Sequence, residues 1–208
     1  MLRIKVCGIT DYEDARLSVG LGADALGFIF AASPRKITLE KARSIIDILP
    51  PFVQTVGVFV NESPDTIRRV MKFCGLDLVQ LHGHEPPDAC RELMPHSIKA
   101  FRLKDESSLL DIPAYAGKVR AILFDTYSER KMGGTGKTFD WRLALKGRGE
   151  GLPVILSGGL TPSNIAEAVS TVRPYAVDVN SGVEERPGKK DPVLLKNFMK
   201  AIGRAGVE

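Results

Sequence analysis

Residues 2–11 read Leu-Arg-Ile-Lys-Val-Cys-Gly-Ile-Thr-Asp, and this stretch sets the pattern of the whole chain. Apolar residues run up to Cys7-Gly8, which is typical of a buried β-strand that ends in a glycine turn. Asp11 then stands where a helix N-cap belongs. A thiol at the carboxyl end of a strand lies where α/β proteins present reactive groups, although free cysteine is also a common inert core residue. The rest of the sequence decides between these two interpretations of Cys7.

The same strand-then-polar-turn layout recurs eight times along the 208 residues. Each candidate strand is short and almost continuously apolar, as in a parallel sheet that is covered on both faces. The predicted strands are Leu2–Cys7, Ala25–Phe30, Thr55–Val60, Leu76–Leu81, Ile98–Leu103, Val119–Phe124, Val154–Ser157 and Ala176–Asn180.

Helical patterns with clear start signals separate these strands. They are expected after Asp11, Thr38, Ser63 and Glu85, and at Asp105–Leu110, Phe139–Leu145, Pro162–Val172 and Pro192–Ile202. Eight strand–helix units favour a closed barrel, because an open doubly wound sheet usually has about five to seven strands. No linker or change in composition divides the chain. We therefore expect an α/β fold, a single-domain (β/α)8 TIM barrel over residues 1–208.

Composition and charge argue against several classes of function. The chain is 44% hydrophobic and 26% charged, with a formal net charge of +4, as in ordinary soluble domains. Basic residues alternate with acidic ones, so we expect no nucleic-acid partner. No apolar run is long enough for a membrane span and no signal peptide opens the chain, so we expect no membrane partner. The three cysteines are odd in number and lack metal-ligand spacing, which predicts a cytoplasmic protein without a metal.

Polar and glycine residues gather at the carboxyl ends of the predicted strands, where barrels of this kind place their active sites. Gly158-Gly159 and Ser181-Gly182 follow strands seven and eight, and such turns expose backbone N–H groups toward one point. The alternative is that both pairs are tight turns that need glycine. Because phosphate sites in these barrels lie after strands seven and eight, we predict a phosphorylated small-molecule substrate there.

Four further residues are candidates for the same site. Cys7 and Asp125 end strands one and six, so their side chains are expected to face each other across the barrel mouth. A thiol and a carboxyl beside a phosphorylated ligand suit a general base and a general acid, although a lone aspartate also caps loops. Arg35 is either a solvated surface charge or a planar fork for a substrate carboxylate. His82 fits a hydrogen-bonded structural role and a place in the site equally well.

Residues 133–138 read Gly-Gly-Thr-Gly-Lys-Thr and mimic a nucleotide-binding loop. The required first glycine would fall at Lys131, and a long polar loop precedes the segment in place of a strand. Phe139 also takes the position of the last glycine in a dinucleotide fingerprint. A flexible glycine loop that covers the mouth of the barrel explains this segment better.

Several motifs, in order along nearly the whole chain, resemble the phosphoribosylanthranilate isomerases of tryptophan biosynthesis. They are Lys5–Thr10, Gly27–Phe30, Ser33–Arg35, Val56–Asn61, Val79–Gly83, Asp125, Gly133–Gly136, Phe139–Trp141, Ser157–Leu160 and Val177–Glu184. Two positions depart from the family pattern. Ser157 stands where the family often has alanine and Asn180 where serine is frequent, and neither change removes a catalytic group.

The resemblance implies an Amadori rearrangement of N-(5-phosphoribosyl)anthranilate to 1-(2-carboxyphenylamino)-1-deoxyribulose 5-phosphate. It also implies that Cys7 is the general base, that Asp125 is the general acid, and that Arg35 binds the anthranilate carboxylate. These roles require a lowered thiol pKa and a raised carboxyl pKa. No metal or organic cofactor would be needed, because the amine of the substrate supplies the electron sink. The working form would be a monomer or a homodimer.

Two alternative functions stay open from the sequence. The histidine-pathway isomerase performs the same rearrangement on another phosphoribosyl amine in a similar barrel, but it resembles a paired-aspartate scheme, so Cys7 counts against it. A non-catalytic phosphate-binding barrel would bind the phosphorylated ligand and show no turnover.

Overall fold

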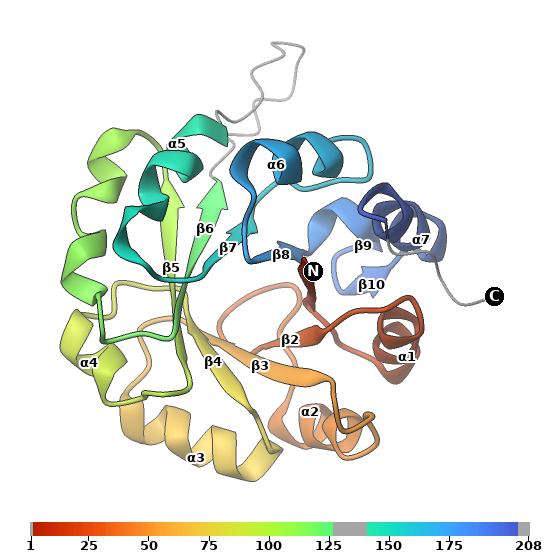
Figure 1. The fold of residues 1–208 in the computed structure, drawn as a ribbon. Helices are drawn as coiled ribbons and strands as arrows, with labels where there is room; N and C mark the ends of the chain where they lie inside the picture. The colour runs from red at the N-terminus through yellow and green to blue at the C-terminus, as the bar shows by residue number, and fades with distance from the viewer. Residues whose placement is uncertain (1, 127–140, 204–208) are drawn as a thin grey trace.

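The computed structural model describes residues 2–126 and 141–203, and its main feature is a closed barrel of parallel strands (Figure 1). Each strand pairs with its neighbours in chain order, and the eighth pairs with the first. The predicted (β/α)8 fold is confirmed. The first and the last residue of every strand lie within two positions of the predicted ones. The strands are β1 Arg3–Cys7, β2 Ala25–Ile29, β3 Gln54–Phe59, β4 Leu78–Leu81, β5 Ser97–Leu103, β6 Ala121–Thr126, β7 Val154–Ser157 and β8 Ala176–Val179.

Helices form a ring outside these strands (Figure 1). Asp11, Thr38 and Ser63 each accept a backbone N–H at a helix start, as their positions in the sequence predict. The α-helices are α1 Tyr12–Gly20, α2 Leu39–Ile46, α3 Pro64–Cys74, α4 Pro87–Arg91, α5 Trp141–Lys146, α6 Ile165–Val172 and α7 Pro192–Ala201. The 3-10 turns are η1 Glu106–Leu109, η2 Ile112–Tyr115, η3 Gly147–Glu150 and η4 Ser181–Val183.

Two of the predicted helices differ from the observed elements. The segment after β5 forms the two separate turns η1 and η2 where one short helix is predicted. Pro113 lies inside the second turn and has no N–H to give to a continuing helix. The start of the predicted helix Phe139–Leu145 and the glycine loop Gly133–Gly136 lie outside the described residues.

The interior of the barrel changes from apolar to polar toward the carboxyl ends of the strands. A buried cluster of apolar side chains fills part of it: Val56, Ile98, Ala100, Ala121, Leu123, Ile155 and Ala176. Side chains alternate in direction along a strand, so residues two positions apart share a face. Gln80 and Asp178 stand two residues beyond Leu78 and Ala176, and Lys5 lies beside Asp178 on β1. These three residues are 5% exposed or less, and they make the inner end of the barrel polar on the side of the strand carboxyl ends.

A hairpin that the sequence does not suggest follows β8. It consists of β9 Glu184–Arg186 and β10 Lys189–Lys190, joined through Pro187-Gly188. Its charged, short strands lack any apolar alternation, which explains why the sequence reads as a loop. Lys190 is only 1% exposed because it pairs with Glu184.

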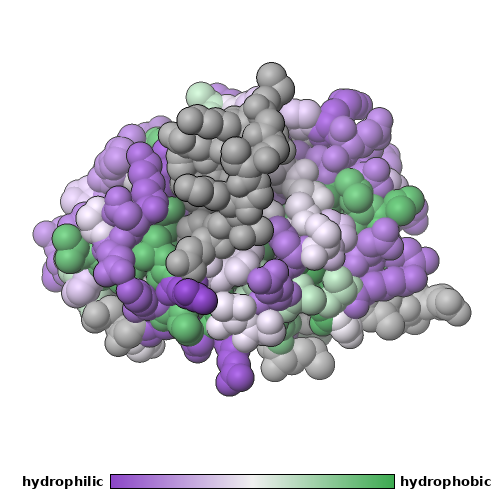
Figure 2. All heavy atoms as spheres, turned by 90° about the horizontal axis from the view of Figure 1, so that it is seen from above, coloured by the Kyte–Doolittle hydropathy of each residue, from purple (hydrophilic) through white to green (hydrophobic). Residues whose placement is uncertain are grey.

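Within the described residues, none of the helices has the length and apolar character that a membrane span requires. The face shown in Figure 2 is mainly hydrophilic, with apolar residues in scattered small groups.

Candidate active site

A cavity of about 500 Å³ opens at the carboxyl ends of the strands. All eight residues that the sequence assigns to the site line it: Cys7, Arg35, His82, Asp125, Gly158, Gly159, Ser181 and Gly182. Residues from β1, β4, β6, β7, β8 and the loop after β2 therefore meet in one place. The cavity is also lined by four residues that are not predicted from the sequence as members of the site: Gln80, Ser157, Asp178 and Asn180.

The glycine turns after β7 and β8 are shaped by the backbone itself. Gly158 and Gly159 adopt left-handed conformations, with φ of +87° and +63°, which glycine alone adopts at little cost. A Cβ atom on Gly182 would lie 1.8 Å from the carbonyl oxygen of Leu160, so the two loops approach too closely for any side chain. Gly158-Gly159 is thus a tight turn that requires glycine for its backbone conformation, whereas Gly182 is required by the close approach of Leu160. The same turns form one wall of the cavity.

Cys7 lies at the end of β1 and is 4% exposed. Burial of its thiol raises the pKa, and the nearby ammonium groups of Lys5 and Lys190 offset this only in part. The lowered thiol pKa expected from the sequence is therefore wrong for this structure. The physical reason is desolvation, which disfavours the thiolate and which cannot be estimated before the burial of the residue is known.

A chain of hydrogen bonds crosses the barrel from β8 to β6. Lys5 Nζ donates to Asp178 Oδ1 at 2.9 Å and to Gln80 Oε1 at 3.0 Å. Gln80 Nε2 lies 2.9 Å from His82 Nδ1, and His82 Nε2 lies 3.1 Å from Asp125 Oδ2. His82 therefore lines the cavity and is in direct contact with the predicted acid.

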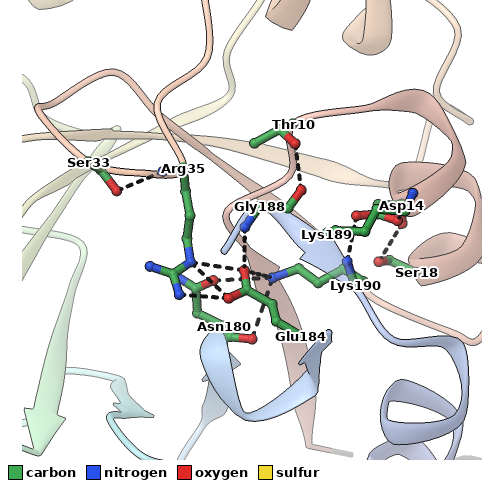
Figure 3. A network of polar contacts seen from close by, with 10 residues as sticks. All are labelled: Thr10, Asp14, Ser18, Ser33, Arg35, Asn180, Glu184, Gly188, Lys189 and Lys190. Carbon is green, nitrogen blue, oxygen red and sulfur yellow. Dashed lines mark hydrogen bonds and ion pairs between the residues drawn. The ribbon is translucent and has the colours of Figure 1, made fainter. Parts of the chain in front are cut away.

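Arg35 binds a carboxylate of the protein itself (Figure 3). Its Nε donates to both oxygens of Glu184, at 2.9 and 3.0 Å, and its Nη2 donates to Oε2 at 2.6 Å. Lys190 Nζ lies 3.0 Å from Oε1 of the same residue. The Glu184 side chain is 2% exposed and that of Arg35 is 19% exposed. Arg35 is thus not a freely solvated surface charge, because its guanidinium is ion-paired with Glu184.

The ionised form of Glu184 is stabilised by these two cations. Burial alone would raise its pKa, but the hydrogen bonds from Arg35 and the charge of Lys190 lower the pKa below its ordinary value. A carboxyl with a lowered pKa in the folded state stabilises the fold above its unfolded pKa, about 4.3 for glutamate. This contribution is lost as the pH falls through the lower pKa of the folded state.

We expect Glu184→Gln to lower the free energy of unfolding by about 3–5 kcal/mol at neutral pH, because it leaves Arg35 and Lys190 facing each other without a counter-charge. Urea denaturation measures this loss, and the exposed Glu185→Gln is the matched control. The difference between parent and variant should shrink as the pH falls below about 4. A difference that is small at pH 7, or that stays constant down to acidic pH, would contradict the role given to Glu184.

The buried charges next to the cavity are the residues that sequence reasoning missed. Lys5 and Asp178 each interrupt a strand that is otherwise apolar, and a charge at such a position signals a buried partner. That signal is enough to place them inside the barrel. It does not identify the partner, because 173 residues separate Lys5 from Asp178.

Fold and cavity together define a class of protein, the (β/α)8-barrel enzymes with the active site at the carboxyl ends of the strands. No group of three or more histidine, cysteine, aspartate or glutamate side chains in the described ranges is arranged to hold a metal ion.

Comparison with known proteins narrows this class to one family. The family model described as N-(5'phosphoribosyl)anthranilate (PRA) isomerase matches residues 4–201. The N-(5'-phosphoribosyl)anthranilate isomerase of Geobacter sulfurreducens is 53% identical over 96% of this chain and 98% of its own. The chain belongs to the phosphoribosylanthranilate isomerase family, and its activity is that of an isomerase of tryptophan biosynthesis. This decides against both alternatives left open by the sequence.

Two solved structures agree with this assignment. The crystal structure of phosphoribosyl anthranilate isomerase from Thermotoga maritima has a TM-score of 0.89 and 48% identity, and covers 97% of this chain and 98% of that chain. A phosphoribosyl anthranilate isomerase in complex with reduced 1-(o-carboxyphenylamino)-1-deoxyribulose 5-phosphate has a TM-score of 0.87 and 45% identity, with the same coverage.

Proposed function

We propose that the chain rearranges N-(5-phosphoribosyl)anthranilate with Asp125 as the general acid and Cys7 as the general base. The observation that carries the proposal is that both side chains line one cavity of about 500 Å³ together with the glycine turns. Asp125 gives its proton to the ribose ring oxygen. The bond from C1 to that oxygen breaks, and the amine lone pair forms the iminium.

The second half of the reaction uses Cys7. The iminium acidifies the proton on C2 of the sugar, and the Cys7 thiolate removes it. The electron pair of that C–H bond forms a C1–C2 double bond, and the iminium nitrogen regains its lone pair. Loss of the C2 hydroxyl proton and protonation of C1 then give the ketone product. Because the pKa of Cys7 is raised, the positive charges of Lys5 and Lys190 are needed to keep its thiolate accessible.

The two charged ends of the substrate would bind to different walls of the cavity. The phosphate would lie against the turns Gly158-Gly159 and Ser181-Gly182, which supply backbone N–H groups. The anthranilate carboxylate would bind the Nη1–Nη2 edge of Arg35, since Glu184 occupies the Nε–Nη2 edge. The aromatic ring would contact the apolar part of the lining, which includes Ile29 and Val58.

The activity is tested by mixing the protein with freshly made phosphoribosylanthranilate and following the loss of anthranilate fluorescence. We expect turnover with this substrate. Binding of phosphoribosylanthranilate without turnover would contradict the proposed function.

Arg35→Met should raise KM by about 10- to 150-fold. The substitution removes the charge-assisted hydrogen bonds from Arg35 to the anthranilate carboxylate, which contribute about 1.5–3 kcal/mol to binding. The effect on kcat should be smaller if the phosphate wall still holds the ribose end. Steady-state kinetics measure both, with the exposed Arg91→Met as the control. Inorganic phosphate should inhibit parent and variant about equally. A parallel loss of phosphate inhibition would show that Arg35 binds the phosphate.

We also propose that residues 1–208 form one domain and that the protein works in the cytoplasm as a monomer or a homodimer. The three cysteines, all buried, are free thiols, which suits a reducing compartment. The Thermotoga maritima isomerase is described as dimeric. Light scattering of the purified protein tests the oligomeric state, and an assembly larger than a dimer would contradict the proposal.

A further inference from the structure

The hydrogen-bond chain beneath the cavity fixes the orientation of Gln80, which is 1% exposed. The ammonium group of Lys5 has only hydrogen atoms to give, and it lies 3.0 Å from Gln80 Oε1. A flipped amide would place the NH₂ group of Gln80 against this cation. The carbonyl oxygen therefore faces Lys5, and the NH₂ group faces the other way, toward His82.

The fixed amide in turn decides which nitrogen of His82 carries a hydrogen. Gln80 Nε2 lies 2.9 Å from His82 Nδ1, and an amide NH₂ group can only donate. Nδ1 must accept this bond, so it bears no hydrogen and the imidazole is the neutral Nε2–H tautomer. Its Nε2–H then donates to Asp125 Oδ2 at 3.1 Å.

The fixed tautomer decides how His82 meets Asp125. Nδ1 is occupied by the amide of Gln80, and no second hydrogen fits there. His82 therefore has one N–H to give, on Nε2, and Asp125 Oδ2 accepts it.

We propose that Gln80 is a positioning residue that holds His82 as the neutral Nε2–H tautomer, so that His82 donates to Asp125 and fixes the orientation of this carboxyl at the substrate cavity. The inference rests on the proposed function, in which Asp125 is the general acid. Asp125 accepts this hydrogen bond through Oδ2. The side chain of Asp125 is 31% exposed and lines the substrate cavity.

The first test needs no substitution. Protein labelled with ¹⁵N at histidine is studied by NMR near pH 7.5, and the signals of His82 are assigned by their loss in His82→Asn. We expect one protonated Nε2 and one unprotonated Nδ1. A protonated Nδ1, in either the other tautomer or the imidazolium, would overturn the proposal whatever the activity of the enzyme.

The second test replaces the donor with an acceptor. Gln80→Glu should move a hydrogen to Nδ1 of His82 in the same NMR experiment, and it should lower kcat by about 10- to 100-fold with KM changed less than about threefold. Gln54→Glu, the same change at the exposed start of β3, is the control. If Gln80→Glu folds and keeps both the tautomer and kcat of the parent, Gln80 has no such role.

The two proposals fail in distinguishable ways. If His82 is the Nε2–H tautomer but Asp125→Asn keeps its rate, the assignment of Asp125 as the acid is wrong and the tautomer inference stands. If Asp125→Asn loses its rate but His82 carries a hydrogen on Nδ1, the acid assignment stands and the role of Gln80 is wrong.

Discussion

We expect Asp125→Asn to lower kcat by about 10²- to 10⁴-fold while the substrate still binds. The amide is nearly the same size as the carboxyl but has no acidic proton to give to the ring oxygen, and loss of a general acid has an effect of this order. The stopped-flow loss of anthranilate fluorescence gives the rate, and titration of the variant with substrate gives its affinity.

The control for this substitution is Asp65→Asn, which makes the same chemical change at an exposed position in the first turn of α3. It should keep the parent kcat. Circular dichroism of both variants checks that the fold is retained. A rate for Asp125→Asn within tenfold of the parent would mean that another group supplies the proton.

We expect Cys7→Ser to remove nearly all turnover as well, with kcat lowered by about 10²- to 10⁴-fold. Serine keeps the approximate size of the side chain, but its hydroxyl is far too weak an acid to form a base near neutral pH. Cys74→Ser is the matched control, since this buried thiol lies on α3 and donates to the carbonyl oxygen of Leu39. A Cys7→Ser variant that keeps most of its kcat would show that the base has been wrongly assigned.

The fold and the membership of the site could be predicted because both follow from local patterns. Short apolar runs such as Val154–Ser157 define the strands, and their number defines the barrel. Once the barrel is known, the residue at the carboxyl end of each strand must face the mouth. This is why Cys7 and Asp125, which are far apart in the chain, are correctly placed in one cavity.

The partners of individual side chains could not be predicted, because they depend on register and burial. Arg35 is correctly placed in the cavity, but its bond to Glu184 arises from a hairpin with no apolar alternation. The raised pKa of Cys7 follows from a degree of burial that the sequence does not contain. The contact between His82 and Asp125 joins β4 and β6, which are not adjacent in the barrel.

The division of labour between Asp125 and Cys7 is tested most directly by trapping the iminium with cyanoborohydride and identifying the reduced amine by mass. Cys7→Ser still has the acid that opens the ring, so it should form the trapped amine faster than substrate without protein. Asp125→Asn lacks that acid and should form it only at the protein-free rate. Rapid trapping by Asp125→Asn with none by Cys7→Ser would contradict the assignment of the acid and the base.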